Sequence, residues 1–274
     1  MDKLVPFPSR ALVPERDAGK EPILETYHLG VDFAGLTAVD DVSLLMGPTE
    51  ITGLIGPNGA GKTTVFNLLT GVYKPTRGSI MLGGISLAGK SPSQIARMGI
   101  ARTFQNIRLF RDMTVEDNIQ VGLSHTLHTN PLEAMLRLPA YWREEKLAHE
   151  KAMELLGLFH MEHLAQDKAG SLPYGAQRRL EILRALASSP RLLLLDEPAA
   201  GMNPSETEEL MEAIVDIRNK FHVAVLLIEH DMKLVMGICE GIMVLDYGRV
   251  IAKGDPDQIR SNPEVIRAYL GKEA

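Results

Sequence analysis

The run Gly56-Pro57-Asn58-Gly59-Ala60-Gly61-Lys62-Thr63 constrains the fold of this chain more than any other feature. It fits the pattern G-x-x-x-x-G-K-[ST], in which backbone N–H groups surround phosphate oxygens, the lysine neutralises the β- and γ-phosphates and the hydroxyl binds Mg²⁺. An apolar run, Ile51 to Ile55, precedes it, and helical sequence, Thr63 to Leu69, follows it. This order of strand, loop and helix predicts a nucleotide phosphate site and disfavours the alternative, a purely structural glycine turn. The residues expected at the nucleotide are Gly56, Asn58, Gly59, Ala60, Gly61, Lys62, Thr63 and Thr64.

Two further apolar runs predict buried strands of the same sheet. Leu192 to Leu195 is followed at once by Asp196-Glu197, and Val223 to Ile228 is followed by Glu229-His230-Asp231. Such continuous apolar runs between helical segments are typical of the parallel sheet of an α/β fold, whose ligands bind at the carboxyl ends of the strands. We therefore expect the polar residues that follow the strands to meet at one edge of the sheet.

The segment between about Asn106 and Leu186 has a different character, because it is rich in helix formers over Glu133 to Lys151 and Met153 to Phe159. We interpret residues 106–186 as a mostly helical subdomain inserted in a P-loop NTPase core of the RecA type. Residues 23–274 then form one domain. Residues 1–22 carry four prolines, mixed charge and no apolar signal segment, so we expect a disordered, cytoplasmic leader.

Composition excludes several other classes of protein. The net charge of -6 supplies no basic surface for a phosphate backbone, which argues against a nucleic-acid partner. The apolar runs fall far short of the roughly 20 residues of a membrane helix, so any role at a membrane must come through partner subunits. The single cysteine, Cys239, cannot form an internal disulfide, and its apolar surroundings indicate a core residue.

Three polar positions are candidates for catalysis. Asp196 and Glu197 supply neighbouring carboxylates, of which one can hold Mg²⁺ and the other can orient or deprotonate the attacking water. A helix start is the ordinary alternative for such a pair, and the presence of the phosphate loop reverses that preference. His230 could reach the γ-phosphate, although a lone histidine is usually a satisfied surface or core residue. Gln105 by itself would be an ordinary solvated amide.

Together these residues resemble the ABC ATPase family from about Leu24 to Gly271. The resemblance implies a Walker A loop at the glycine run, a Walker B strand ending at Asp196 as the metal ligand, and a catalytic Glu197. It further implies a Q-loop glutamine at Gln105, which would also reach the metal, and a switch histidine at His230. Phe33 matches the aromatic that stacks on adenine, with a buried strand phenylalanine as the alternative. The D-loop, Ala200-Gly201-Met202-Asn203, ends in Asn where the family more often has Asp.

The family's signature, usually Leu-Ser-Gly-Gly-Gln, corresponds here to Leu172-Pro173-Tyr174-Gly175-Ala176. In the family this segment meets the nucleotide bound to the opposite subunit, which implies nucleotide contacts from Leu172, Tyr174 and Gly175. Pro173 has neither the serine hydroxyl nor a backbone N–H, so that contact cannot be carried over. We expect the Gly175 N–H and the positive end of the following helix to hold the γ-phosphate instead.

Within the family, the stretches Arg102-Thr103-Phe104-Gln105 and Val265 to Gly271 are similar to the LivG-type ATPases of branched-chain amino acid importers. That resemblance implies ATP and Mg²⁺ as cofactors and a peripheral position at the cytoplasmic face of the plasma membrane. The implied partners are two permease subunits, a second ATPase of the LivF type or a copy of this chain, and an extracytoplasmic substrate-binding protein. Leu109-Phe110 would contact a permease, unless the pair is ordinary packing.

Other functions would require sequence features that differ from those of this chain. ATPases for urea or amide uptake and for lipopolysaccharide export are similar, although the export ATPases usually keep a Ser-Gly-Gly signature. Two-cassette proteins that act on ribosomes or DNA would need a second phosphate loop or a basic surface, and a small-molecule kinase has no need of Gln105 or His230. The transported solute does not contact this subunit, so the sequence leaves it open.

Overall fold

Six strands form the central sheet, sheet B, of the computed structural model, which describes residues 22–123 and 139–270. These strands are β3 (Ile51–Ile55), β6 (Ile100–Arg102), β7 (Leu192–Asp196), β8 (Ala224–Ile228), β9 (Gly241–Asp246) and β10 (Arg249–Gly254). Their order is β10-β9-β3-β8-β7-β6, and every neighbouring pair is parallel except β10 with β9. The expected α/β fold with a mostly parallel sheet is confirmed.

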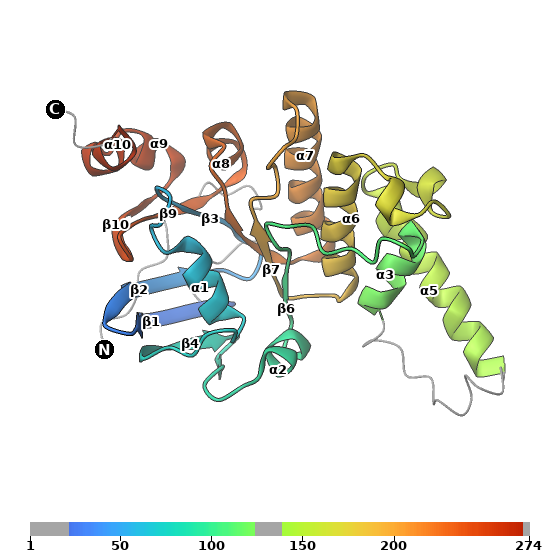
Figure 1. Ribbon diagram of the computed structural model, residues 1–274, viewed down its shortest axis with the longest axis horizontal. Coiled ribbons are helices and arrows are strands. Elements are labelled where there is room, and N and C mark those ends of the chain that lie inside the picture. The colour runs from blue at the N-terminus through green and yellow to red at the C-terminus, as the bar shows by residue number, and fades with distance from the viewer. Residues whose placement is uncertain (1–21, 124–138, 271–274) are drawn as a thin grey trace.

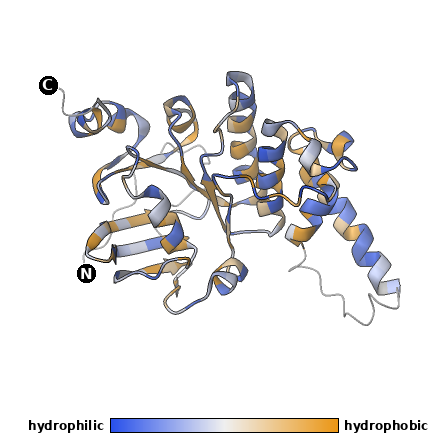
Figure 2. Cartoon of the chain, in the orientation of Figure 1, coloured by the Kyte–Doolittle hydropathy of each residue, from blue (hydrophilic) through white to orange (hydrophobic). Residues whose placement is uncertain are grey.

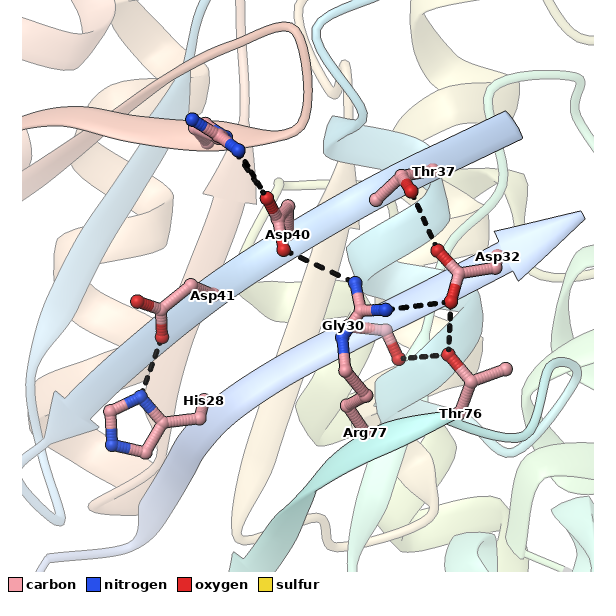
Figure 3. Close-up of polar contacts among 9 residues, drawn as sticks. His28, Gly30, Asp32, Thr37, Asp40, Asp41, Thr76 and Arg77 are labelled. Carbon is pink, nitrogen blue, oxygen red and sulfur yellow. Dashed lines mark hydrogen bonds and ion pairs between the residues drawn. The ribbon is translucent and has the colours of Figure 1, made fainter. Parts of the chain in front are cut away.

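A second sheet, sheet A, is antiparallel. Its strands are β1 (Leu24–Phe33), β2 (Leu36–Met46), β4 (Arg77–Leu82) and β5 (Ile85–Ser86), in the order β2-β1-β4-β5. Charged side chains connect it on one face, where Arg77 lies between Asp32 at 2.7 Å and Asp40 at 3.1 Å (Figure 3). Arg249 of β10 pairs with the same Asp40 at 2.7 Å, so the network also joins the two sheets.

Helices cover sheet B on the face opposite sheet A and continue the fold to either side of it (Figure 1). They are α1 (Lys62–Leu69), α2 (Pro92–Arg97), α3 (Val115–Leu123), α5 (Pro139–Gly157), α6 (Tyr174–Ala187), α7 (Pro204–Phe221), α8 (Met232–Ile238), α9 (Pro256–Arg260) and α10 (Pro263–Leu270). Two 3₁₀ turns, Glu162–Leu164 and Ala169–Ser171, lead into α6. Of these helices, α1 packs between the two sheets, whereas α3, α5 and α6 pack against one another at the far side of the molecule.

Alternate residues of each central strand serve the two faces of sheet B, because successive side chains of a strand point in opposite directions. Leu193 and Leu195 pack into the core beneath α6, α7 and α8. Leu192 and Leu194 pack into the core shared with α1 and sheet A. Since both faces are covered, the strands read as uninterrupted apolar runs, which Figure 2 shows as orange along the centre of the molecule.

Helix α5 differs from the sequence expectation, which separated Glu133 to Lys151 from Met153 to Phe159. Residues 133–138 lie outside the described residues, and from Pro139 a single helix runs to Gly157. Ala148, Ala152 and Leu155 are all buried against the core, so the apolar stripe continues through Ala152, the residue between the two expected stretches. Alanine has the highest helix propensity of all residues, which explains why the helix does not break there.

Two further sequence expectations concern the ends of the chain and the membrane. The expected leader, residues 1–22, lies outside the described residues apart from Pro22. Among the helices of the described ranges, none has both the length and the apolar character needed to cross a bilayer. Cys239 is buried, as expected for a core residue, and burial raises the pKa of its thiol.

Candidate functional site

The phosphate loop connects β3 to α1 through backbone that only glycine adopts easily. Gly56 and Gly61 have φ of 149° and 98°. A Cβ at Gly56 would lie 2.1 Å from the Leu245 carbonyl oxygen, and one at Gly61 would lie 2.8 Å from that of Ala38. The glycines therefore allow the loop to pack closely on β9 and β2 directly before α1 begins.

Lys62 opens α1, and its side chain lies under the loop. It is only 6% exposed, and its ammonium donates to the carbonyl oxygens of Gly56 at 2.6 Å and Pro57 at 2.9 Å. Burial lowers the pKa of Lys62, while the Glu197 and Asp196 carboxylates act to raise it. The loop thus has a cation held at its centre, facing two carboxylates.

Glu197 lies directly after β7, and two side chains from other strand ends hold its carboxylate. Gln105, after β6, donates from Nε2 to one oxygen at 3.1 Å, and His230, after β8, is joined through Nε2 to the other at 2.6 Å. Glu197 itself has φ of 51°, in the left-handed region that is costly for a residue with a Cβ. Its N–H donates to the Ile228 carbonyl at 2.9 Å, which fixes this turn to β8.

A cleft of about 610 Å³ joins the phosphate loop to these three side chains. The predicted residues that line it are Asn58, Gly59, Ala60, Gly61, Lys62, Thr63, Thr64, Gln105, Glu197 and His230. Leu36, Thr37, Ala38 and Tyr247 complete its wall. The structure therefore brings together, at the carboxyl edge of sheet B, residues that lie more than a hundred positions apart in the sequence.

Asp196, the last residue of β7, is 2% exposed and pairs with a residue that the sequence did not single out for a role. Arg102 Nη2 donates to Asp196 Oδ2 at 2.8 Å, and Nη1 donates to Asn67 of α1 at 2.7 Å. The guanidinium also stacks between the rings of Phe66 and Phe104. Arg102 therefore fixes one carboxylate oxygen of Asp196 and leaves Oδ1 as the oxygen available to a ligand.

Glu229 stabilises the turns that follow β7 and β8. It is 3% exposed, and its carboxylate accepts hydrogen bonds from the backbone N–H of Ala199 at 2.7 Å and of His230 at 2.9 Å. Burial raises the pKa of Glu229, and these hydrogen bonds act in the opposite direction. The residue before His230 is thus part of the support of the site.

The signature segment forms the start of α6, away from the cleft of its own chain. Pro173 is the N-cap residue of this helix, which begins at Tyr174. The Leu172 side chain is buried in the core, so only its backbone can face a ligand, whereas Tyr174 is 47% exposed. Gly175 abuts α7, where a Cβ on it would lie 2.6 Å from Glu206 Oε1. The backbone of Gly175 thus lies next to the Glu206 carboxylate, at the start of α6.

Phe33, the last residue of β1, lies at the surface beside Tyr73. It is 40% exposed, so it is not a buried strand residue, and its ring meets the edge of Tyr73 at a centroid distance of 4.9 Å. The cleft is lined on this side by Leu36, Thr37 and Ala38, three to five positions further along the chain. The contact of Phe33 with adenine stays a prediction.

Three residues around the cleft carry functions that the sequence did not assign. Arg102 and Arg178 are buried cations that bind groups of the site, and Tyr247 is an 88% exposed aromatic on the cleft wall. Arg102 lies three positions before Gln105, and this nearness was the only signal in the sequence that could have indicated a role for it. Nothing in the sequence distinguishes Arg178 from its neighbour Arg179, which is less buried, since the burial of Arg178 depends on tertiary packing.

Two family profiles match the chain. The profile described as ABC transporter matches residues 39–200, and that described as branched-chain amino acid ATP-binding cassette transporter matches residues 249–274. The first covers the phosphate loop, Gln105, the signature segment and Glu197, and the second covers α9 and α10.

Curated relatives and solved structures agree with these profiles. The high-affinity branched-chain amino acid transport ATP-binding protein LivG of Escherichia coli K12 is 52% identical over 92% of this chain and 99% of its own length. BraF of Pseudomonas aeruginosa, with the same description, is 50% identical over 92% and 98%. The lipopolysaccharide export protein LptB of Haemophilus influenzae is 33% identical over the same shares. The ADP conformation of MJ1267, an ATP-binding cassette of an ABC transporter, superposes with a TM-score of 0.79 at 30% identity, covering 92% of this chain and 99% of the other.

Proposed function

This chain belongs to the ABC transporter family, and from that premise we propose that it is the ATPase subunit that powers import of branched-chain amino acids. The observation that supports this choice of solute is the 52% identity with LivG over almost the whole length of both chains. The identity with LptB of Haemophilus influenzae is 33%. The C-terminal profile match over residues 249–274 supports the same assignment. An ATPase for urea or amide uptake or for lipopolysaccharide export is the alternative.

The geometry of Glu197 supports its role in activating the attacking water. Both of its oxygens are held, one by Gln105 and one by His230, and its carboxylate faces the cleft that the phosphate loop lines. A carboxylate in this position can accept a proton from water or orient it for in-line attack on the γ-phosphate. We assign His230 to the γ-phosphate and Gln105 to the water and the metal, because they approach Glu197 from opposite sides.

Mg²⁺ fits the oxygen donors around the loop. The ion is usually held by one or two protein ligands, waters and substrate phosphates rather than by an all-protein cage. Within the described ranges no group of three or more His, Cys, Asp and Glu side chains could hold a metal, which agrees with that mode. We propose that Thr63 Oγ1, Asp196 Oδ1 and Gln105 surround the ion, and that it neutralises charge on the phosphates when it is bound.

The second half of the ATP site comes, in this proposal, from another ATPase subunit. The start of α6 lies outside the chain's own cleft, so its Leu172, Tyr174 and Gly175 are free to face a nucleotide on a LivF-type partner or on a copy of this chain. Two permease subunits and an extracytoplasmic binding protein complete the importer. With these partners the chain would lie on the cytoplasmic face of the plasma membrane.

The role of Gly175 needs a test that separates phosphate binding from packing. Any side chain at this position would collide with Glu206, so a Gly175 substitution alone could act through α7. We suggest Gly175→Ala in a Glu206→Ala background, with Glu206→Ala as the matched control. Alanine keeps the backbone N–H and adds only a Cβ, so the variant tests whether phosphate approaches this backbone too closely for a side chain. If it does, the double variant loses ATP-dependent dimerisation and turnover relative to that control. Equal dimerisation and turnover in the two proteins would reject so close an approach.

The permease contact is proposed at the loop after Gln105. Phe110 is 48% exposed and lines a hollow of about 510 Å³ with Leu109, Val121 and Arg184. An exposed aromatic beside apolar neighbours is suited to a short helix of a membrane subunit. Phe110→Ala should lower solute uptake more than ATP turnover, whereas Ile85→Ala, at an exposed apolar position of β5 outside this hollow, should change neither. Unchanged uptake in the Phe110 variant would contradict the assignment.

Purification of the membrane complex with this chain as bait tests the function as a whole. In vesicles with the co-purified permeases and binding protein, leucine, isoleucine and valine should each stimulate phosphate release from ATP. Glu197→Gln should abolish that stimulation. Stimulation by urea, an amide or a lipopolysaccharide instead would replace the proposed solute without changing the ATPase assignment.

A further inference from the structure

The side chain of Arg178 lies in the interior of the protein, behind the catalytic edge. Arg178 is the fifth residue of α6 and is 0% exposed. Its guanidinium donates to the backbone carbonyls of Phe104 at 2.5 Å, Gln105 at 2.6 Å and Glu197 at 3.3 Å. It also pairs with Glu181 of the same helix at 3.0 Å. One side chain therefore contacts three segments of the chain: the signature helix, the strand end before Gln105 and the turn after β7.

Two of these carbonyls belong to residues whose side chains meet in the cleft. Gln105 Nε2 and Glu197 Oε2 are 3.1 Å apart, and the guanidinium binds the backbone of both residues. A shift of either backbone would change the distance between the amide and the carboxylate. The planar fork of arginine can serve several oxygens at fixed angles, which a lysine ammonium cannot do.

Glu181 extends the same support to the next part of the loop. Its second oxygen accepts a hydrogen bond from the Arg108 backbone N–H at 3.2 Å. The pair Arg178–Glu181 thus holds the segment from Phe104 to Arg108 at both ends. This segment leads directly to Phe110.

A second buried pair provides a comparison within the same chain. Arg218 of α7 and Glu240, just before β9, are 1% and 0% exposed and 2.7 Å apart. In both pairs the arginine Nε has no hydrogen-bond partner. Further contacts of this pair include the Thr49 carbonyl and the Ile51 N–H, at the amino ends of the strands. Arg218 and Glu240 are as buried as Arg178 and Glu181, yet they lie at the edge of sheet B opposite to the cleft.

We propose that Arg178 is a positioning residue for ATP hydrolysis: through the backbone carbonyls of Gln105 and Glu197 it fixes where their side chains meet, and it ties that geometry to the signature helix. The inference rests on the proposed roles of Glu197 and Gln105. It predicts a loss of turnover without a matching loss of nucleotide binding, because Arg178 itself does not line the cleft and acts through the backbone of Gln105 and Glu197.

The experiment compares the double variants Arg178→Met/Glu181→Leu and Arg218→Met/Glu240→Leu in the full-length chain with its co-purified partners. Apolar replacement of a whole buried pair avoids leaving one charge alone, and such replacements are often tolerated. We expect kcat for ATP to fall about tenfold to a hundredfold in the first variant, since a misplacement of about 1 Å can cost that much. The KM for ATP and the affinity for a fluorescent ATP analogue should stay within about threefold of wild type. The second variant should keep its kcat within about twofold.

Arg178→Lys keeps the charge of the side chain but not its planar fork. We expect the midpoint of its urea unfolding to match wild type while its kcat stays as low as that of Arg178→Met/Glu181→Leu. A kcat in Arg178→Met/Glu181→Leu equal to that of the Arg218 control would overturn the inference, as would full recovery of kcat by lysine. Glu197→Gln, measured in the same assay, separates the proposed function of Glu197 from the positioning role of Arg178. If it retains turnover, the proposed function of Glu197 is wrong; if only the Arg178 variants retain turnover, the positioning role alone is wrong.

Discussion

Two arginine–aspartate pairs in this molecule have nearly the same geometry and very different surroundings. Arg102 and Asp196 are 2.8 Å apart at the carboxyl edge of sheet B, with side chains 7% and 3% exposed. Arg77 and Asp32 are 2.7 Å apart on sheet A, with side chains 47% and 34% exposed (Figure 3). Coulomb attraction is weak in water and strong in a buried site, so distance alone does not tell what a pair contributes. We expect the charges of the buried edge to control activity and stability, and those of sheet A to contribute little.

The largest effect is expected from Glu197→Gln, because this carboxylate is the proposed group that acts on water. Loss of a general base typically costs about two to four orders of magnitude in rate. The amide keeps the size of the side chain and an acceptor oxygen, so ATP binding should remain. Phosphate release and titration with a fluorescent ATP analogue measure the two quantities. Glu209→Gln, at an exposed position of α7, is the control, and a Glu197→Gln turnover above a tenth of wild type would contradict the assignment.

Arg102→Met should have the next largest effect, this time on folding. Methionine can keep the contact with the rings of Phe66 and Phe104, but it leaves Asp196 as an unpaired charge in a buried position. Removal of one partner of such a pair typically costs about 3–5 kcal/mol. Urea unfolding should show this loss, and Arg102→Met/Asp196→Asn should recover part of it. A loss below about 1 kcal/mol would mean that burial does not distinguish this pair from Arg77–Asp32.

Much of the fold and of the site could be predicted from the sequence because of local patterns. The glycines of the phosphate loop and the apolar runs before Asp196 and His230 are each continuous in sequence, and the rule that parallel strands present their carboxyl ends together brings them to one edge. That rule is enough to predict that the phosphate loop, Glu197 and His230 meet, whereas the place of Gln105 followed only from the resemblance to the ABC ATPase family.

What the sequence did not reveal depends on long-range packing. Arg102 and Arg178 have ordinary sequence neighbours, and only the tertiary fold shows that both are buried and that their guanidinium groups bind groups of the site. The collision that a side chain at Gly175 would have with Glu206 involves two helices and could not be seen in the signature segment alone.

A pH-dependent effect of intermediate size is expected at Glu229. Burial raises the pKa of this carboxyl above its usual value, so the folded protein holds the proton more tightly than the unfolded chain. Its contribution to stability is therefore complete below the unfolded pKa and is lost as the pH rises through the folded pKa. Glu229→Gln removes this dependence, so the stability of the variant relative to wild type should increase from pH 4.5 towards pH 8. Unfolding free energies across this range test the sign, and a difference that falls with pH would show that the ionised form is the stabilised one.

The smallest effect is expected from Arg77→Met on sheet A. The hydrogen bond from Thr37 is the largest influence on the pKa of Asp32 and lowers it, whereas desolvation, the next largest, acts to raise it. The Thr76 hydrogen bond and the charge and hydrogen bond of Arg77 lower this pKa further. Loss of Arg77 leaves the two threonine hydroxyls in place, and Arg249 still pairs with Asp40, so neither carboxylate is left alone. Both carboxylates are also open to water, which replaces the lost partner and screens the remaining charges.

Methionine keeps an unbranched chain that can lie over Gly30, where the Arg77 side chain packs. The unfolding midpoint of Arg77→Met should therefore match wild type within error in both low and high salt. A loss as large as that of Arg102→Met, removed by salt, would mean that the exposed network acts as a unit and that burial is not what separates the two pairs.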